Sequence, residues 1–445
     1  MDLNEQMRAD WNRRAAEDAF YHVAFERRMQ SPDEFLANGI HTAALFEREL
    51  IYLPAADPAS LRALEVGCGP GRLMRPMSRH FGEIHGIDIS DEMLKRAREV
   101  LTDIPHAHVH LAPESDLRMF AKDWFDFVYS YAVFQHIPSR EVVLNYLDEM
   151  ARVLKPNGIL CCHLRGAPAP SSELRTGSPT WTGDGYYFEL NDIRDFVSRN
   201  RLQLLTTWCL ETLHMLITVR KPARPKDLTI DRPTPILLGA RPSGNGYSRE
   251  VPRRGRQAAV SLWIAGLPED CGLTDLEVSI GGTRVTPCHI TLGPESARQI
   301  NALLPRNIGV GPVTIGVTCR GQRLAQTFEL DVTDGDPEPP SIVCVTDAEN
   351  LALQHLVCSS ALKIVIQNVE NPDSLRACLG KVPLDLCEIV REDPVMAQYE
   401  YTLRLPNSID GGNHLLAATV DGFDLPPVSV EIEAEQKRES GNLLT

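Results

Sequence analysis

Apolar residues recur at helical and at strand-like spacings along this chain, and the helical spacing largely disappears after about residue 222. Over residues 1–58 they stand three or four positions apart, as in DWNRRAAEDAFYHVAFERRM, which predicts amphipathic N-terminal helices. Over residues 59–222 short apolar runs such as LRALEV and FDFVYS alternate with helix-spaced segments such as REVVLNYLDEMARVL. Strands that alternate with helices predict a parallel sheet covered on both faces by helices.

The second half of the chain has a strand-like pattern. Residues 223–236 are rich in proline, which predicts a linker. Residues 237–335 and 340–434 consist of short β-branched runs separated by Gly, Pro and Asp, the pattern of two small all-β sandwiches. The last residues, 435–445, are predicted to form a disordered tail.

The two β-rich segments repeat one another. LEVSIGGTRVTPCHI aligns with LRACLGKVPLDLCEI, and ALLPRNIGVGPVTIGVTCRG aligns with LRLPNSIDGGNHLLAATVDG. Five anchor pairs hold a nearly constant offset: Leu276 with Leu375, Cys288 with Cys387, Pro305 with Pro406, Gly311 with Gly412 and Gly321 with Gly422. We therefore expect a duplication in which each copy buries a separate core, so that a chain ending near Pro222 should fold alone.

Composition narrows the function classes. The chain is 43% hydrophobic and 24% charged, values typical of a soluble globular protein. Its net charge of −15 argues against nucleic acid as a partner, and no apolar run is long enough to span a membrane. The N-terminal sequence MDLNEQMRADWNRR has charges where a signal peptide needs an apolar core, which favours a cytoplasmic location. The eleven cysteines form no C-x-x-C pair, and no metal site is predicted.

The stretch LEVGCGPGRL places three glycines directly after an apolar strand and before a helix-spaced segment. Such a turn brings backbone N–H groups close to a ligand. A nicotinamide dinucleotide would need G-x-G-x-x-G/A, but Arg72 or Met74 stands where the last small residue is required. A nicotinamide-dependent oxidoreductase is therefore the disfavoured alternative.

The pattern is instead acid-x-Gly-x-Gly-x-Gly, formed by Glu65, Gly67, Gly69 and Gly71. It resembles the first motif of class I S-adenosylmethionine-dependent methyltransferases of type 11. GIDISDEML, FDFVYSYAVFQHI and EMARVLKPNGIL resemble later segments of that family, and the likeness covers roughly residues 40–222. It implies an α/β Rossmann-like domain with a seven-stranded, mostly parallel sheet, and S-adenosyl-L-methionine as the cofactor. The two sandwiches resemble immunoglobulin-like modules, which are expected to bind a protein partner or to self-associate.

The resemblance also implies the roles of individual residues. Glu65 attracts the ammonium group of the cofactor, the glycines with Cys68 pass its methionine and ribose portions, and Asp88 accepts the ribose hydroxyls. Pro113 stands where many members carry an acid, so we expect Asp116 and the Leu117 amide at the adenine. The remaining expected contacts are Ile89 and Met93 beside the adenine, Ser130 and Tyr131 after the fourth strand, and Tyr21 on an N-terminal helical lid.

Methyl transfer is an in-line displacement, so the protein mainly positions the acceptor and excludes water. A base is required only where the acceptor must lose a proton. His136 is the candidate base, with Gln135 to orient the acceptor, although a histidine that only fixes this turn remains the alternative. The acceptor is predicted to be a small or saccharide-like molecule. A non-catalytic protein, in which this fold is retained and the immunoglobulin-like modules bind a partner, is the alternative outside enzymes.

Overall fold

The computed structural model describes residues 3–24, 29–112, 116–166, 185–210, 212, 214–223, 234–243, 249–253, 258–292, 297–305, 307–335, 339–348, 355–393, 397–406 and 409–433. The chain divides into two compact units. The first unit comprises Met1–Val23, Ser31–Arg253 and Gln257–Asp334, and the second consists chiefly of Gly335–Thr445. The predicted tail and most of the predicted linker lie outside the described residues, as does the region of residues 167–184.

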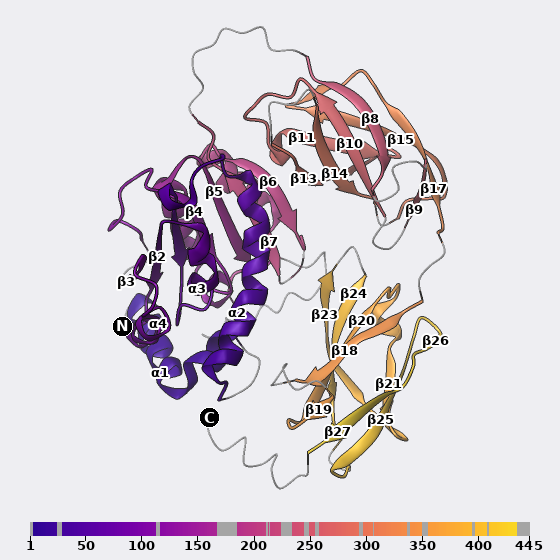
Figure 1. The fold of residues 1–445 in the computed structure, drawn as a ribbon. Coiled ribbons are helices and arrows are strands. Elements are labelled where there is room, and N and C mark those ends of the chain that lie inside the picture. Colours follow the sequence, from indigo (N-terminus) through magenta and orange to yellow (C-terminus); the bar gives the residue numbers. More distant parts are fainter. Residues whose placement is uncertain are drawn as a thin grey trace. The chain divides into compact units, whose positions relative to one another are not determined.

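The N-terminal part of the first unit contains the helices that the spacing of apolar residues predicts (Figure 1). Side-chain caps define where several of them begin: Ser31 and Glu34 form a capping box, and the Ser90 hydroxyl accepts from the Met93 amide at 3.1 Å. The helices are α1 (Leu3–Ala24), α2 (Pro32–Glu47), α3 (Met74–Met77), α4 (Asp91–Val100), α5 (Arg140–Val153) and α6 (Leu190–Arg199), and a 3₁₀ turn, η1 (Arg48–Tyr52), follows α2.

Seven strands of this part form the predicted sheet. Their order is β3-β2-β1-β4-β5-β7-β6. β1, β2, β3, β4 and β5 run parallel, whereas β7 is antiparallel to both β5 and β6. The Rossmann-like expectation is therefore confirmed. The strands are β1 (Arg62–Val66), β2 (Glu83–Asp88), β3 (Ala107–Leu111), β4 (Phe125–Ser130), β5 (Leu154–Leu164), β6 (Gln203–Trp208) and β7 (Met215–Arg220).

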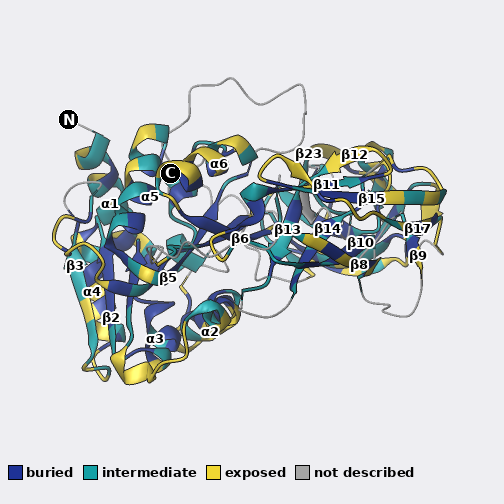
Figure 2. Ribbon diagram, turned by 90° about the horizontal axis from the view of Figure 1, so that it is seen from above, coloured by how far each residue is buried: buried dark blue, intermediate teal, exposed yellow. Residues whose placement is uncertain are grey.

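The sheet does not end at β6. His289 of β13 (Pro287–Ile290) pairs with Thr206, and the sheet continues as β13-β14-β10-β8 to eleven strands. β6 is buried over five of its six residues, which an uncovered edge strand would not be (Figure 2). The added strands are β14 (Arg298–Leu303), β10 (Ala259–Ala265) and β8 (Ile236–Pro242).

A second sheet, β12-β11-β15-β17-β9 with β16 beside β15, completes the first β-rich module. Its strands are β9 (Glu250–Pro252), β11 (Leu276–Ile280), β12 (Thr283–Val285), β15 (Gly311–Cys319), β16 (Gln322–Arg323) and β17 (Phe328–Thr333). One buried apolar cluster runs from the Rossmann-like sheet into this module. The expectation that the first module buries a separate core is therefore wrong, because its edge strand β13 extends the sheet at β6.

Polar contacts hold η1 against β6 and β7, and others join these elements to the first β-rich module. Glu49 is 2% exposed, and its carboxylate accepts from Trp208 Nε1 at 3.2 Å and from Thr218 Oγ1 at 2.9 Å. Nearby, the Tyr52 hydroxyl lies 3.2 Å from His289 Nδ1, and Gln203 Nε2 donates to the Cys271 carbonyl at 2.7 Å. The Tyr52–His289 and Gln203–Cys271 hydrogen bonds define one arrangement of η1 and β6 against the module.

The second unit repeats the first module with a core of its own. Its sheets are β18-β20-β24-β23 and β19-β27-β25-β21-β22, so the strand order matches that of the first module strand for strand. Paired glycines adopt the same left-handed backbone, with φ of 122° at Gly311 and 126° at Gly412. The two modules thus have the same strand order, in agreement with the repeat seen in the sequence. The strands are β18 (Ser341–Asp347), β19 (Leu356–Val357), β20 (Ala361–Gln367), β21 (Arg376–Leu379), β22 (Val382–Pro383), β23 (Asp385–Asp393), β24 (Gln398–Arg404), β25 (Gly412–Val420), β26 (Phe423–Asp424) and β27 (Val428–Ile432).

None of the helices in the described part of the chain is both long enough and apolar enough to cross a bilayer.

Candidate functional site

The three predicted glycines form the turn between β1 and α3, and each has a left-handed backbone. Their φ angles are 73° at Gly67, 49° at Gly69 and 82° at Gly71. A Cβ atom on Gly67 would lie 2.3 Å from the Val133 side chain, closer than any real contact. The turn therefore requires glycine at this position for both backbone conformation and space.

The same turn is attached to the end of β2. The amides of Gly67 and Cys68 both donate to the Ile87 carbonyl, at 2.9 and 2.8 Å. Asp88 accepts from the Gly69 amide at 2.9 Å and from the Ser90 amide at 2.8 Å. Burial raises the pKa of Asp88 to about 6. A carboxylate has about four lone-pair positions, so Asp88 retains acceptor capacity beyond these two hydrogen bonds.

Glu65 lies one residue before the end of β1 and is 3% exposed. The Tyr129 hydroxyl donates to its Oε2 atom at 2.9 Å. Burial raises the pKa of Glu65 to about 8, against the opposing effects of the Tyr129 hydrogen bond and the Arg72 charge. Cys68 is buried as well, and burial keeps its pKa well above the usual value, so it stays a neutral thiol.

Helix α1 covers this edge of the sheet, as predicted for the N-terminal helices. Val23 lies over the glycine turn, 3.3 Å from where a Cβ on Gly69 would stand. Ala15 and Ala19 form a small apolar cluster with Met93, which is 1% exposed. Met93, predicted beside the adenine, therefore packs against the helix α1. Ile89, the residue after β2, is only partly buried and packs against the main core.

Tyr21 is in the last turn of α1, next to a break in the helix. Asp18 has non-helical backbone angles, φ −163° and ψ 87°, and its Oδ1 atom accepts from the Tyr21 amide at 3.1 Å. The Tyr21 ring lies edge-on to His22, with 5.2 Å between the ring centroids.

Four more predicted residues lie at the end of β4 or in the turn after it: Ser130, Tyr131, Gln135 and His136. The Ser130 hydroxyl is fully buried and donates to the Val66 carbonyl at 2.8 Å, so it joins β4 to β1 instead of facing the turn. The Tyr131 ring lies 5.1 Å from the His163 ring, and the Arg72 guanidinium carbon is 5.9 Å from the Tyr131 ring centroid.

The side chains of Gln135 and His136 contact each other, with 3.1 Å between Gln135 Nε2 and His136 Nε2. Trp11 of α1 packs edge-to-face on the His136 ring at a centroid distance of 5.4 Å. The predicted catalytic pair thus lies at the same edge of the sheet as the glycine turn, with an aromatic residue of α1 against it.

Two residues on the predicted adenine side are engaged elsewhere. The Leu117 amide donates to Glu149 Oε2 at 3.0 Å, so its expected hydrogen bond to a ring nitrogen is not supported. Asp116 accepts from the Arg118 amide at 3.0 Å and forms an ion pair with the Arg118 side chain at 3.2 Å. Glu149 lies on α5, distant in the sequence, and no local pattern signals its contact with Leu117.

The sequence pattern does not predict Asn12 as a residue beside the candidate site. Its Oδ1 atom accepts from Ser90 Oγ at 2.6 Å and from the Glu92 amide at 3.3 Å, directly after the Asp88 segment. A polar residue among helix-spaced positions normally indicates a solvated face, so the sequence carried no signal for this contact.

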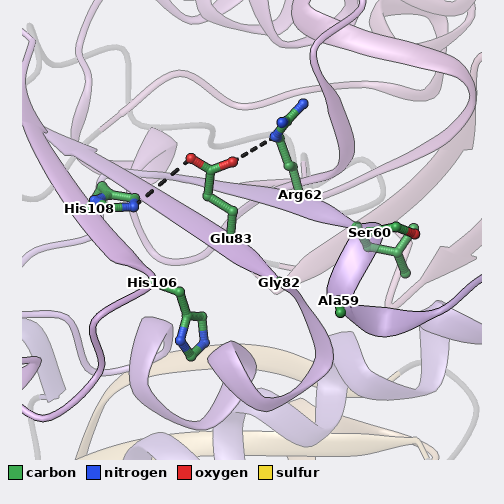
Figure 3. Close-up of a pocket in the computed structure, with 8 residues that line it drawn as sticks. Ala59, Ser60, Arg62, Gly82, Glu83, His106 and His108 are labelled. Carbon is green, nitrogen blue, oxygen red and sulfur yellow. Dashed lines mark hydrogen bonds and ion pairs between the residues drawn. The ribbon is translucent and has the colours of Figure 1, made fainter.

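A separate cavity of about 290 Å³ lies at the opposite, amino-terminal end of β1 and β2. Figure 3 shows Glu83 in its wall between Arg62 and His108, with Arg62 Nε 2.6 Å and His108 Nε2 3.9 Å from the Glu83 carboxylate. None of the predicted site residues lines it. Its lining residues are Ala59, Ser60, Leu61, Arg62, Gly82, Glu83, His106 and His108.

A family model and several known proteins are similar to part of this chain. Residues 64–162 match the family model of a methyltransferase domain. The chain is 33% identical over 105 residues to 2-methyl-6-phytyl-1,4-hydroquinone methyltransferase of Synechocystis sp., which covers 23% of this chain and 31% of that protein. It is 30% identical over 118 residues to trans-aconitate 2-methyltransferase of Rhodopseudomonas palustris, which covers 26% of this chain and 42% of that protein.

Among solved structures, magnesium protoporphyrin IX methyltransferase of Synechocystis with bound SAH is similar at 16% identity and a TM-score of 0.37, over 49% of this chain and 99% of that chain. The present chain spans less than half the length of the two curated relatives named above. The segment that matches the family model contains the glycine turn, Asp88 and the turn after β4. Residues 64–162 of this chain are therefore similar to the methyltransferase-domain family.

Proposed function

We propose that this protein is an S-adenosyl-L-methionine-dependent methyltransferase acting on a small-molecule or saccharide-like acceptor. One observation carries the proposal: a glycine turn with three left-handed residues is hydrogen-bonded to one partly buried carboxylate, Asp88, and follows directly after a fully buried one, Glu65. A ligand that combines a cation with a neutral sugar suits two carboxylates. A diphosphate would be repelled by them.

The residues present fit this cofactor. Gly67, Gly69 and Gly71 carry no side chains and have left-handed backbones, which lets a ligand approach the backbone of the turn closely. Asp88 would accept the ribose hydroxyls with its remaining lone pairs, and Glu65 would face the ammonium group. The pKa of Glu65, raised to about 8 by burial, is expected to fall when a cation approaches, because the charge then has a partner.

The bound cofactor supplies an activated methyl group, and this chain's residues position the acceptor and exclude water. Helix α1 covers the glycine turn through Val23 and the turn after β4 through Trp11. A covered site strengthens each electrostatic contact inside it and suppresses competing hydrolysis. Trp11 is a flat apolar wall against which a planar or apolar acceptor would pack.

His136 would remove the proton from a hydroxyl or amine acceptor. Its Nε2 atom lies 3.1 Å from Gln135 Nε2, so Gln135 is placed to fix the ring orientation or to contact the same acceptor. The names of the relatives, a hydroquinone methyltransferase and a trans-aconitate methyltransferase, support a small acceptor for this chain as well. We further propose that the second β-rich unit provides contacts with a protein partner or with another copy.

Calorimetry with S-adenosylhomocysteine (SAH) tests the cofactor assignment. We expect micromolar binding to the full chain, its loss in Gly67→Ala, where the added Cβ would lie 2.3 Å from Val133, and weaker binding in Asp88→Asn. Glu83→Gln, at the opposite end of β2, is the matched control and should bind normally. Binding of a nicotinamide dinucleotide in place of SAH would refute the assignment.

Incubation of a cell extract with isotopically labelled cofactor tests the acceptor class. The proposal expects label in the small-molecule fraction. Label in RNA or protein would contradict it, and cofactor binding without any transfer would favour the non-catalytic alternative.

A further inference from the structure

Asn12 connects α1 to the carboxylate that we assign to the ribose. Its Oδ1 atom accepts from Ser90 Oγ at 2.6 Å and from the Glu92 amide at 3.3 Å. The Ser90 amide in turn donates to Asp88 Oδ1 at 2.8 Å. One side chain of α1 is thus separated from Asp88 by a single residue and two hydrogen bonds.

The orientation of the Ser90 hydroxyl is determined by its second role. Its oxygen accepts from the Met93 amide at 3.1 Å, as the N-cap of α4, which leaves its proton for an acceptor outside the helix. Asn12 Oδ1 is that acceptor. The contact therefore depends on an acceptor atom at position 12 and on an unbroken N-terminus of α4.

The residue before Asn12 contacts the other half of the site. Trp11 packs edge-to-face on His136 with 5.4 Å between the ring centroids, and His136 contacts Gln135. Both Trp11 and Asn12 precede the break at Asp18, whereas Val23, over the glycine turn, follows it. The first helical segment of α1 therefore joins the cofactor end of the site to the acceptor end.

We infer that Asn12 is a positioning residue that couples occupancy of the cofactor site to the placement of Trp11 at the acceptor turn, an inference that rests on the proposed function. A ribose held by Asp88 orders the segment that includes Ser90. Ser90 then holds Asn12, and with it Trp11 against His136. Binding of the cofactor would therefore place Trp11 as the wall of the acceptor site before the acceptor binds. Release of the cofactor would require the Asn12–Ser90 hydrogen bond to break.

The test compares SAH dissociation from full-length variants by stopped-flow fluorescence. Loss of one hydrogen bond corresponds to a factor of roughly three to ten, so Asn12→Ala should raise the dissociation rate constant by about that factor. Asn12→Asp retains an acceptor oxygen at the same reach and should stay within about twofold of wild type. Arg13→Ala is the matched control, because Arg13 neighbours Asn12 on α1 but pairs with Asp10 and Glu17 at its exposed face.

Hydrogen exchange supplies a readout that a purely structural role would not change. SAH should slow amide exchange in residues 3–17 of wild type and Asn12→Asp, and this slowing should be lost in Asn12→Ala while β4 remains protected. If wild type binds no SAH, the proposed function fails and this inference fails with it. If wild type binds SAH but Asn12→Ala dissociates and exchanges like wild type, the coupling is wrong and the proposed function stands.

Discussion

Removal of the Glu49 carboxylate tests whether a buried acceptor on η1 stabilises β6 and β7, the strands next to the first β-rich module. Glu49 is almost fully buried where η1 meets β6 and β7, beside the Tyr52–His289 contact with β13. Its carboxylate accepts from Trp208 Nε1 and Thr218 Oγ1 at 3.2 and 2.9 Å. The substitution Glu49→Ala leaves the buried Thr218 hydroxyl and the indole N–H of Trp208, whose side chain is partly exposed, without this acceptor.

The expected loss of stability follows from those contacts. A hydrogen bond to a charged group contributes about 1.5–3 kcal/mol, and buried donors left unsatisfied add a desolvation cost. Two such bonds predict that Glu49→Ala lowers the free energy of unfolding of the first unit by about 3–5 kcal/mol. The second unit has a separate core and should be unaffected.

Urea unfolding of the full chain can separate the two units. All five tryptophans precede residue 335, so tryptophan fluorescence reports the first unit, whereas far-UV circular dichroism reports both. Glu49→Ala should shift the fluorescence transition and leave one of the circular dichroism transitions in place.

Glu47→Ala is the control for the Glu49 substitution, because it removes a carboxylate two residues away. Glu47 pairs with Arg79 and His80 at partly exposed positions, where ion pairs contribute at most about 1 kcal/mol. A Glu49→Ala transition no different from that of Glu47→Ala would refute the argument that the buried carboxylate stabilises the packing of η1 on β6 and β7.

Three further predictions follow from the fold and the charges. A chain ending at Pro222 should aggregate or lose stability, because β6 becomes an uncovered edge strand. A chain ending at Asp334 should fold, bind SAH and elute as a compact species on gel filtration. The affinity for SAH should increase as pH rises from about 6 to 8, because the Glu65 carboxyl, whose pKa is about 8 in the free protein, must lose its proton beside the ligand ammonium. Calorimetry in two buffers of different ionisation enthalpy should detect this proton release, and an affinity that does not change with pH would contradict the prediction. Desolvation lowers the pKa of His85 below its usual 6.5, so the folded state binds fewer protons than the unfolded state and stability should fall as pH drops through 6.5. In His85→Phe the free energy of unfolding, measured at several pH values, should depend less on pH.

Local sequence patterns determined much of this architecture. Glycines followed by a helix-spaced segment predicted the turn after β1, and a turn in which each of the three residues has positive φ requires such a sequence. The alternation of strands and helices predicted a parallel sheet covered by helices, and the repeated anchors predicted two related modules, whose strand orders match in the structure. These features depend on residues close together in the chain, so periodicity and turn residues specify them.

Contacts between distant segments were decided only by the tertiary structure. The sequence of β6 does not indicate whether its edge meets solvent or another strand, and the pairing of Thr206 with His289 made the first module part of one sheet. Likewise, the Leu117 amide is engaged by Glu149, and Asn12 reaches Ser90 across the site. A donor or an edge strand has the same local pattern whichever partner satisfies it. The partner is determined by how the packed elements bring distant residues together, and local periodicity does not encode that arrangement.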